Sequence, residues 1–222
     1  MTEEKVIFKD SKGNKLSGIL SDSNSKVKIV ILCHGLNSKK DSSTNLALVK
    51  AFSRHGIATF RFDFFAHGES EGKVEDRTVE KFVDGLLKAV DYVKGQGYSK
   101  IGVCGASFGG MTAVIAATKT PDIKAIALKA AGMGQTSRKM PNYKEDFDTK
   151  IWIKAGEKVK IPTLIVHGTE DEDVEIQLGE ELAKSIKASK FIKFEGADHR
   201  FTNPEDFEKS VKLISDFISN NL

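Results

Sequence analysis

Three side chains of this sequence have the types and order needed to attack a carbonyl carbon: a serine between glycines, a later carboxylate and a histidine near the C-terminus. Ser107 stands in the pentapeptide Gly-Ala-Ser-Phe-Gly at residues 105–109. A serine hydroxyl is a weak nucleophile unless a base removes its proton and the backbone presents it sharply. The pentapeptide is short and its residues are common, so its structural context must decide its meaning.

The segments on either side of Ser107 supply that context. An apolar run at 101–104 precedes the serine, and small residues follow it from Gly109 onward. This pattern predicts a tight strand-to-helix turn, which would raise the hydroxyl at the end of a sheet. The N-terminus of the following helix would also favour negative charge that develops near the serine.

Strand-like and helix-like segments alternate along the chain from about residue 27. Apolar runs predict strands at 27–32, 57–65, 100–104, 123–130, 161–166 and 190–194. Apolar residues at helical spacing predict helices at 45–55, 78–94, 109–118, 176–186 and 204–218. Such alternation implies right-handed crossovers between parallel strands. We therefore predict an α/β fold with a mostly parallel, doubly wound sheet, preceded by an antiparallel hairpin that turns at Gly13 and Asn14.

The length of 222 residues suits a single domain, residues 1–222. One segment, 131–160, is longer than a connection between two strands requires, and it predicts a small cap over the site. Its Met133, Met140 and Trp152 can line an acyl or aromatic pocket, or they can form the core of the cap itself.

Composition narrows the possible partners. The chain has 34 basic and 31 acidic residues, a net charge of +3, which lacks the clustered basic excess of nucleic-acid binders. No run is long enough to span a membrane, and the polar N-terminus has no leader pattern, so we expect a cytoplasmic protein. The histidines lack metal-ligand spacing and no phosphate-binding motif is present, so we expect no metal and no cofactor. Cys33 and Cys104 end apolar runs and are interpreted as buried thiols.

Several motifs together resemble the α/β-hydrolase superfamily, over nearly the whole chain from about residue 5. They are His34-Gly35-Leu36 after a strand, the loop at 63–70, the serine turn at 105–109, and two later segments at 167–174 and 196–199. Within the superfamily the chain is similar to small bacterial and archaeal esterases, which include the cinnamoyl and feruloyl esterases. Acyl-peptidase-related hydrolases are close relatives.

The resemblance implies a catalytic triad, because the family order is nucleophile, acid, histidine. Ser107 would be the nucleophile and His199 the general base, with the acid orienting the histidine. By residue type alone several carboxylates fit the acid position. The family spacing from the His-Gly pair at 167–168 selects Asp171, and the other candidates are Glu170, Glu172 and Asp173.

The resemblance also implies an oxyanion hole made by the backbone N–H groups of Phe108 and Leu36. Many relatives have an aromatic residue at the position of Leu36, but a backbone donor does not depend on the side chain. His34 and His167, which each precede a glycine at a strand end, are interpreted as partners of loop backbone. The loop at 63–70 is interpreted as structural, with Asp63 holding its backbone.

The leading functional hypothesis is a serine hydrolase that cleaves small carboxylic esters through a covalent acyl-enzyme, with aromatic-acid esters as one substrate class. The same triad also serves thioesterases, acyl-peptidases and acyltransferases, and its residues do not separate these activities. A third hypothesis is a binding protein that has kept the fold without catalysis. The presence of all three triad residues argues against it, since a lost activity gives no physical reason to keep them.

Overall fold

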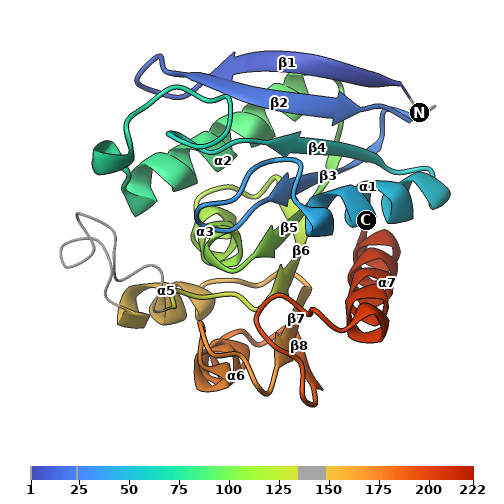
Figure 1. The fold of residues 1–222 in the computed structure, drawn as a ribbon. Coiled ribbons are helices and arrows are strands. Elements are labelled where there is room, and N and C mark those ends of the chain that lie inside the picture. The colour runs from blue at the N-terminus through green and yellow to red at the C-terminus, as the bar shows by residue number, and fades with distance from the viewer. Residues whose placement is uncertain (1, 24, 135–148) are drawn as a thin grey trace.

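The sheet follows the predicted plan. The computed structural model describes residues 2–23, 25–134 and 149–222, and within them eight strands form one sheet in the order β1-β2-β4-β3-β5-β6-β7-β8 (Figure 1). The hairpin pair β1 and β2 is antiparallel, β2 is antiparallel to β4, and the remaining neighbours are parallel. The strands are β1 (Glu3–Lys9), β2 (Lys15–Ser21), β3 (Lys28–Cys33), β4 (Ala58–Phe62), β5 (Lys100–Ala106), β6 (Ile123–Lys129), β7 (Thr163–Gly168) and β8 (Ser189–Phe194).

Helices cover both faces of the sheet, as a doubly wound fold requires. Figure 1 shows α1 and α7 on one face and α2, α3, α5 and α6 on the other. Their bounds are α1 (Ser43–Arg54), α2 (Val79–Gly95), α3 (Phe108–Ala117), α5 (Thr149–Gly156), α6 (Ile176–Ser185) and α7 (Pro204–Asn221), with a short 3-10 turn η1 (Val74–Asp76) before α2. The predicted mostly parallel α/β sheet with an antiparallel hairpin at one edge is confirmed.

The central strands have unbroken apolar runs because both of their faces are buried. In β3, Ile29 and Ile31 pack toward α2 and α3, whereas Val30 and Leu32 pack toward α1 and α7. Successive side chains of a strand point to opposite faces, so each core receives every second residue. The result is two separate hydrophobic layers that hold the strand ends in fixed positions.

The long helix α2 shows how local sequence sets an element's start. The Thr78 hydroxyl accepts the backbone N–H of Lys81 and so caps the first turn. Behind this cap, Phe82, Leu86 and Val90 form an apolar stripe that packs on the sheet.

The predicted cap segment is described in part. Its helix α5 is the crossover between β6 and β7 and packs against α3 and α6. Met133 and Trp152 are 5% and 1% exposed and belong to the hydrophobic core. Both side chains pack in the same hydrophobic cluster as residues of α3 and the sheet, so they belong to the core of the domain and not to a separate core of the cap. Their role as pocket residues stays a prediction. Met140 lies outside the described residues, and the cap stays a prediction.

Both cysteines are buried and unpaired, as predicted. Burial raises the pKa of the Cys33 and Cys104 thiols well above the usual value, so both stay protonated.

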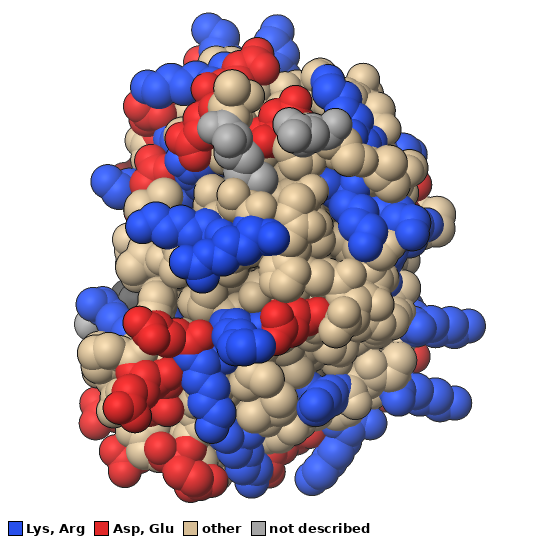
Figure 2. All heavy atoms as spheres, turned by 90° about the vertical axis from the view of Figure 1, so that its right-hand side faces the viewer, with Lys and Arg blue, Asp and Glu red and all other residues tan. Residues whose placement is uncertain are grey.

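Among the described residues, no helix has the length and apolar character needed to cross a bilayer. On the face that carries α7, basic and acidic side chains lie side by side and do not form a surface of one sign (Figure 2).

Candidate active site

The turn at Ser107 joins β5 to α3 and has a strained backbone. Ser107 has φ of 51° and ψ of −122°, a region that residues other than glycine rarely adopt. Its N–H donates to the carbonyl of Lys129 over 2.9 Å, and its own carbonyl accepts the N–H groups of Gly110 and Gly132 over 2.9 and 3.2 Å. These hydrogen bonds hold the serine at the carboxyl end of the sheet, as the pentapeptide predicted.

Close packing explains the two glycines of the pentapeptide. A Cβ on Gly105 would lie 2.4 Å from the Gly109 carbonyl oxygen. A Cβ on Gly109 would lie 2.5 Å from the carbonyl oxygens of Cys33 and His34. Any larger side chain at either position would push α3 away from β3 and β5, so the motif has a steric cause.

The carboxylate and the histidine come from the loops after β7 and β8. His199 Nδ1 donates to Asp171, with the two carboxylate oxygens 2.8 and 3.0 Å away. Asp171 also accepts the N–H groups of Asp173 and Val174 over 3.0 and 2.8 Å. The structure thus pairs Asp171, among the four candidate carboxylates, with Nδ1 of the histidine. Asp173 lies on the other side of the ring, with its Oδ2 3.7 Å from Nε2.

Asp171 has a second imidazole partner that the sequence interpretation missed. His167 Nε2 lies 3.0 Å from the Val174 carbonyl oxygen, as the backbone interpretation predicted, and also 3.1 Å from Asp171 Oδ2. Because both neighbours accept hydrogen bonds, the proton of a neutral His167 belongs on Nε2. The i, i+4 spacing of the two residues was the available signal, but the pair forms only because the loop turns back over the strand end.

Several donors keep Asp171 ionised although its side chain is fully buried. Burial by itself would raise its pKa. Hydrogen bonds from His167, His199 and the Val174 N–H, together with the nearby charge of His199, outweigh burial and lower the pKa of Asp171 well below its usual range. An ionised Asp171 can stabilise a protonated His199.

The loop after β3 approaches the serine turn at Gly35, the residue before Leu36. A Cβ on Gly35 would lie 3.3 Å from Ser107 Cβ, so the two turns are in contact. His34 Nδ1 donates to the Gly35 carbonyl over 2.7 Å, and its Nε2 accepts the Phe64 N–H over 3.1 Å. Burial is the main cause that lowers the pKa of His34 to about 4, so the ring is neutral near pH 7. The backbone interpretation of His34 is confirmed.

A buried arginine ties the Leu36 loop to its neighbour. Arg77 Nη1 donates to Asn37 Oδ1 over 3.0 Å, and Nη2 donates to the Ala66 carbonyl. Asn37, directly after Leu36, has φ of 56°. The arginine therefore braces a left-handed turn next to the predicted oxyanion donor, and nothing in its local sequence indicated this role.

The loop at 63–70 is structural, as predicted. The buried Asp63 carboxylate accepts the N–H groups of Lys40 and Glu69 and pairs with the Lys40 ammonium at 2.6 Å. Ala66 in this loop has φ of 58°. The strain of this left-handed alanine is held by the contacts around it.

All three predicted triad residues follow the carboxyl ends of parallel strands, so they lie at the same end of the sheet. Open α/β sheets bind ligands at this end. Within the described residues both hydrogen bonds of His199 join Nδ1 to Asp171, and Nε2 lies 3.7 Å from Asp173 Oδ2. The same part of the chain has no cluster of three or more His, Cys, Asp or Glu side chains that could hold a metal ion.

A chain with this sheet order and these helical layers has the α/β-hydrolase fold. It belongs to the family described as serine aminopeptidase, S33, whose model matches residues 24–153, more than half of the chain. Among curated proteins, the mouse alpha/beta hydrolase domain-containing protein 17C is 26% identical over 173 residues. That match covers 77% of this chain and 53% of the mouse protein, so the chain spans about half the length of that relative.

Solved structures share the fold over nearly the whole chain. Est1E from Butyrivibrio proteoclasticus, solved with ferulic acid bound, is 24% identical, with a TM-score of 0.84 and coverage of 97% of this chain and 98% of that one. The Pyrococcus furiosus esterase Pf2001 is 21% identical, with a TM-score of 0.84 and coverage of 99% and 92%. At these identities the structures show the shared fold, and the class of hydrolase rests on the family.

Proposed function

We propose that this protein is a serine hydrolase that cleaves small carboxylic esters through a covalent acyl-enzyme. The observation that carries the proposal is the strained Ser107 turn at the same carboxyl-terminal end of the sheet as the hydrogen-bonded Asp171–His199 pair. A strained turn held by hydrogen bonds exposes a hydroxyl, and an oriented imidazole is the base that such a hydroxyl needs.

In the first half of the proposed reaction, Ser107 Oγ attacks the ester carbonyl while His199 Nε2 takes its proton. The N–H groups of Phe108 and Leu36 donate to the oxygen that becomes negative. Asp171 holds the ring with Nε2 toward the substrate and stabilises the imidazolium. His199 then protonates the alcohol, which leaves, and Ser107 carries the acyl group as an ester.

In the second half, water replaces the alcohol. His199 Nε2 takes a proton from water, and the resulting hydroxide attacks the acyl carbonyl through the same oxyanion hole. The acid leaves, and the proton returns to Ser107 Oγ. Each proton that the base accepts is returned within the cycle, so the reaction needs neither a metal nor a cofactor.

The finer substrate proposal is an ester of an aromatic acid, and the solved Est1E structure with ferulic acid supports it by analogy of fold. A cytoplasmic location is also part of the proposal, and the two unpaired thiols support it, because reducing compartments keep thiols free.

The decisive experiment compares ester hydrolysis by the parent, Ser107→Ala and Ser99→Ala, the last being an exposed serine on the surface. With p-nitrophenyl acetate, p-nitrophenyl butyrate and methyl ferulate, we expect turnover by the parent and by Ser99→Ala. The kcat of Ser107→Ala should fall by at least about 10³-fold. Equal turnover by parent and Ser107→Ala would overturn the proposal.

The family description favours one alternative, hydrolysis of an amide bond by the same triad. Aminoacyl p-nitroanilides compared with p-nitrophenyl esters and acyl thioesters in one assay separate these substrates by kcat/KM. A fluorophosphonate probe that labels Ser107 in the parent, and labels neither Ser107→Ala nor His199→Ala, would exclude a non-catalytic binding protein.

A further inference from the structure

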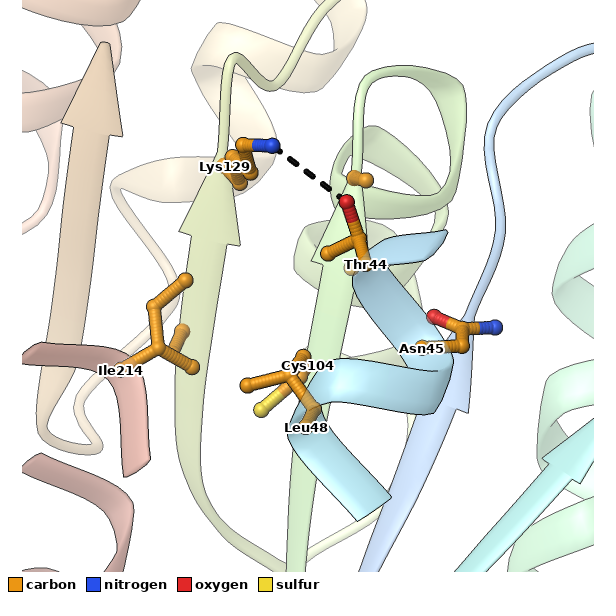
Figure 3. A pocket seen from close by; sticks show the side chains of 9 residues that line it. Thr44, Asn45, Leu48, Cys104, Lys129 and Ile214 are labelled. Carbon is orange, nitrogen blue, oxygen red and sulfur yellow. Dashed lines mark hydrogen bonds between the residues drawn. The ribbon is translucent and has the colours of Figure 1, made fainter. Parts of the chain in front are cut away.

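Lys129, the last residue of β6, carries a buried ammonium that the proposed reaction does not use. Its side chain is 4% exposed and lies in a small pocket between α1 and the ends of β5 and β6 (Figure 3). Its Nζ makes two hydrogen bonds within the described residues, to Thr44 Oγ1 over 3.3 Å and to the Arg200 carbonyl over 3.2 Å. Both partners are neutral, so this cation is buried at a cost in desolvation that calls for a functional reason.

The same ammonium also lies on aromatic rings. Nζ is 4.6 Å from the ring centre of Phe201 and 5.0 Å from that of Phe207. Arg200 and Phe201 directly follow His199, and Phe201 has φ of 57°. The ammonium therefore contacts two consecutive residues of the turn that carries the proposed base.

The backbone of Lys129 contacts the other half of the site. Its carbonyl accepts the Ser107 N–H over 2.9 Å. We propose that Lys129 is a positioning residue, which fixes the His199 turn relative to the Ser107 turn by binding one with its ammonium and the other with its carbonyl. This proposal rests on the proposed serine-hydrolase function.

Protonation should control this contact. Burial lowers the pKa of Lys129 to about 8, and the negative charge of Asp198 opposes that shift. The other groups around Nζ are the thiol of Cys104 in β5, which burial keeps neutral, the carbonyl of Arg200, and neutral side chains of α1 and α7. A neutral amine binds a carbonyl and aromatic rings less strongly than an ammonium does. The kcat of ester hydrolysis should therefore fall as pH rises through about 8.

The test compares Lys129→Met with Lys124→Met, a matched change at an exposed position of the same strand. Lys129→Met should lower kcat about tenfold at pH 7, with KM changed less than about twofold, because misplaced groups slow chemistry more than binding. The kcat of Lys129→Met should not show the decrease that we expect for the parent as pH rises through about 8. Its melting temperature should stay the same or rise, because methionine removes a buried charge. Lys124→Met should match the parent in every measurement.

Two outcomes would overturn the inference. One is a Lys129→Met enzyme with parental kcat and an unchanged alkaline fall. The other is a loss of kcat that accompanies a lower melting temperature, which indicates a purely structural role. Lys129→Arg, which stays charged at every pH tested, should also lack the alkaline fall, and it replaces the methionine variant if that does not fold. Fluorophosphonate labelling of Ser107 in the parent tests the proposed function separately, so the two failures are distinguishable.

Discussion

His34 and His167 occupy matching places in the sequence but have different partners in the structure. Each lies at a strand end before a glycine, and each is buried. His34 donates to the Gly35 carbonyl and accepts the Phe64 N–H, so its contacts are with neutral backbone. His167 contacts the Val174 carbonyl and also the ionised Asp171.

The difference comes from the loops that follow the two strands. After β7 the chain turns back within four residues and brings Asp171 Oδ2 to 3.1 Å from His167 Nε2. After β3 the chain leads to Leu36 and Asn37, and the backbone that meets His34 comes from the loop after β4. One histidine therefore supports the predicted oxyanion loop, and the other supports the predicted acid. Substitutions in each region should have effects of different size and kind.

The largest effect is expected for Asp171→Asn, which removes the charge that both His167 and His199 contact. An amide can hold the wrong tautomer of His199 and does not stabilise an imidazolium, so kcat should fall about 10³- to 10⁴-fold. The control is Asp173→Asn, whose carboxylate lies 3.7 Å from the other ring nitrogen. Steady-state ester hydrolysis gives kcat for both variants. If Asp173→Asn lost as much kcat as Asp171→Asn, the assignment of Asp171 as the acid would be wrong.

A smaller effect is expected for His167→Phe, which keeps the ring and removes the donor to Asp171. A hydrogen bond to a charged group contributes about 1.5–3 kcal/mol, so kcat should fall about 10- to 100-fold if this bond holds the carboxylate in place. His167→Gln, which retains an N–H donor, should recover part of the loss. If both variants had the kcat of the parent, His167 would contribute to packing and not to catalysis.

His167→Phe should also change acid stability. The pKa of Asp171 is lowered in the folded protein, so its contribution to stability is complete above the unfolded value of about 3.9 and is lost as pH falls through the folded value. Loss of the His167 hydrogen bond raises the folded pKa of Asp171. Acid unfolding of the variant, followed by circular dichroism, should therefore begin at a higher pH than in the parent.

A lesser catalytic effect is expected for His34→Gln, because the hydrogen bonds that His34 makes with the described residues go to neutral backbone groups. A hydrogen bond of this kind contributes about 0.5–1.5 kcal/mol, so kcat should fall no more than about tenfold. Its pH effect differs as well: the pKa of His34 is lowered from 6.5 to about 4, so the parent loses stability as pH falls from 6.5 toward 4. Urea unfolding across this range should show a shallower loss in His34→Gln, and an unchanged slope would contradict a neutral buried His34.

The smallest effect is expected for Ala66→Gly, in the loop held by Arg77 near His34. Glycine removes the strain of φ at 58°, and we expect a gain of about 1 kcal/mol or less, measured as a melting temperature a few degrees higher at most. Ala47→Gly, in the middle of α1, is the same change in a helix and should destabilise the protein by about 1 kcal/mol. Loss of stability in both variants would mean that Ala66 is not strained.

Local sequence patterns predicted most of the helices and strands of the fold. The predicted helix at 78–94 is observed as Val79–Gly95, and the strands lie where the apolar runs placed them. The serine turn was predictable too, because strand, glycine-flanked serine and helix adjoin in the sequence. The sequence selected the acid only through family spacing, since Glu170, Asp171, Glu172 and Asp173 are all carboxylates in the same short loop.

The sequence by itself determined the element order, the two-sided burial of the central strands and the place of Ser107, because these depend on neighbours within a few residues. Only the tertiary structure decided that Asp171 contacts His199 and that Lys129 spans the serine and histidine turns. Those contacts depend on how loops from separate strands meet at the carboxyl-terminal end of the sheet. Convergence is a property of packing over the whole sheet, and no local spacing encodes it.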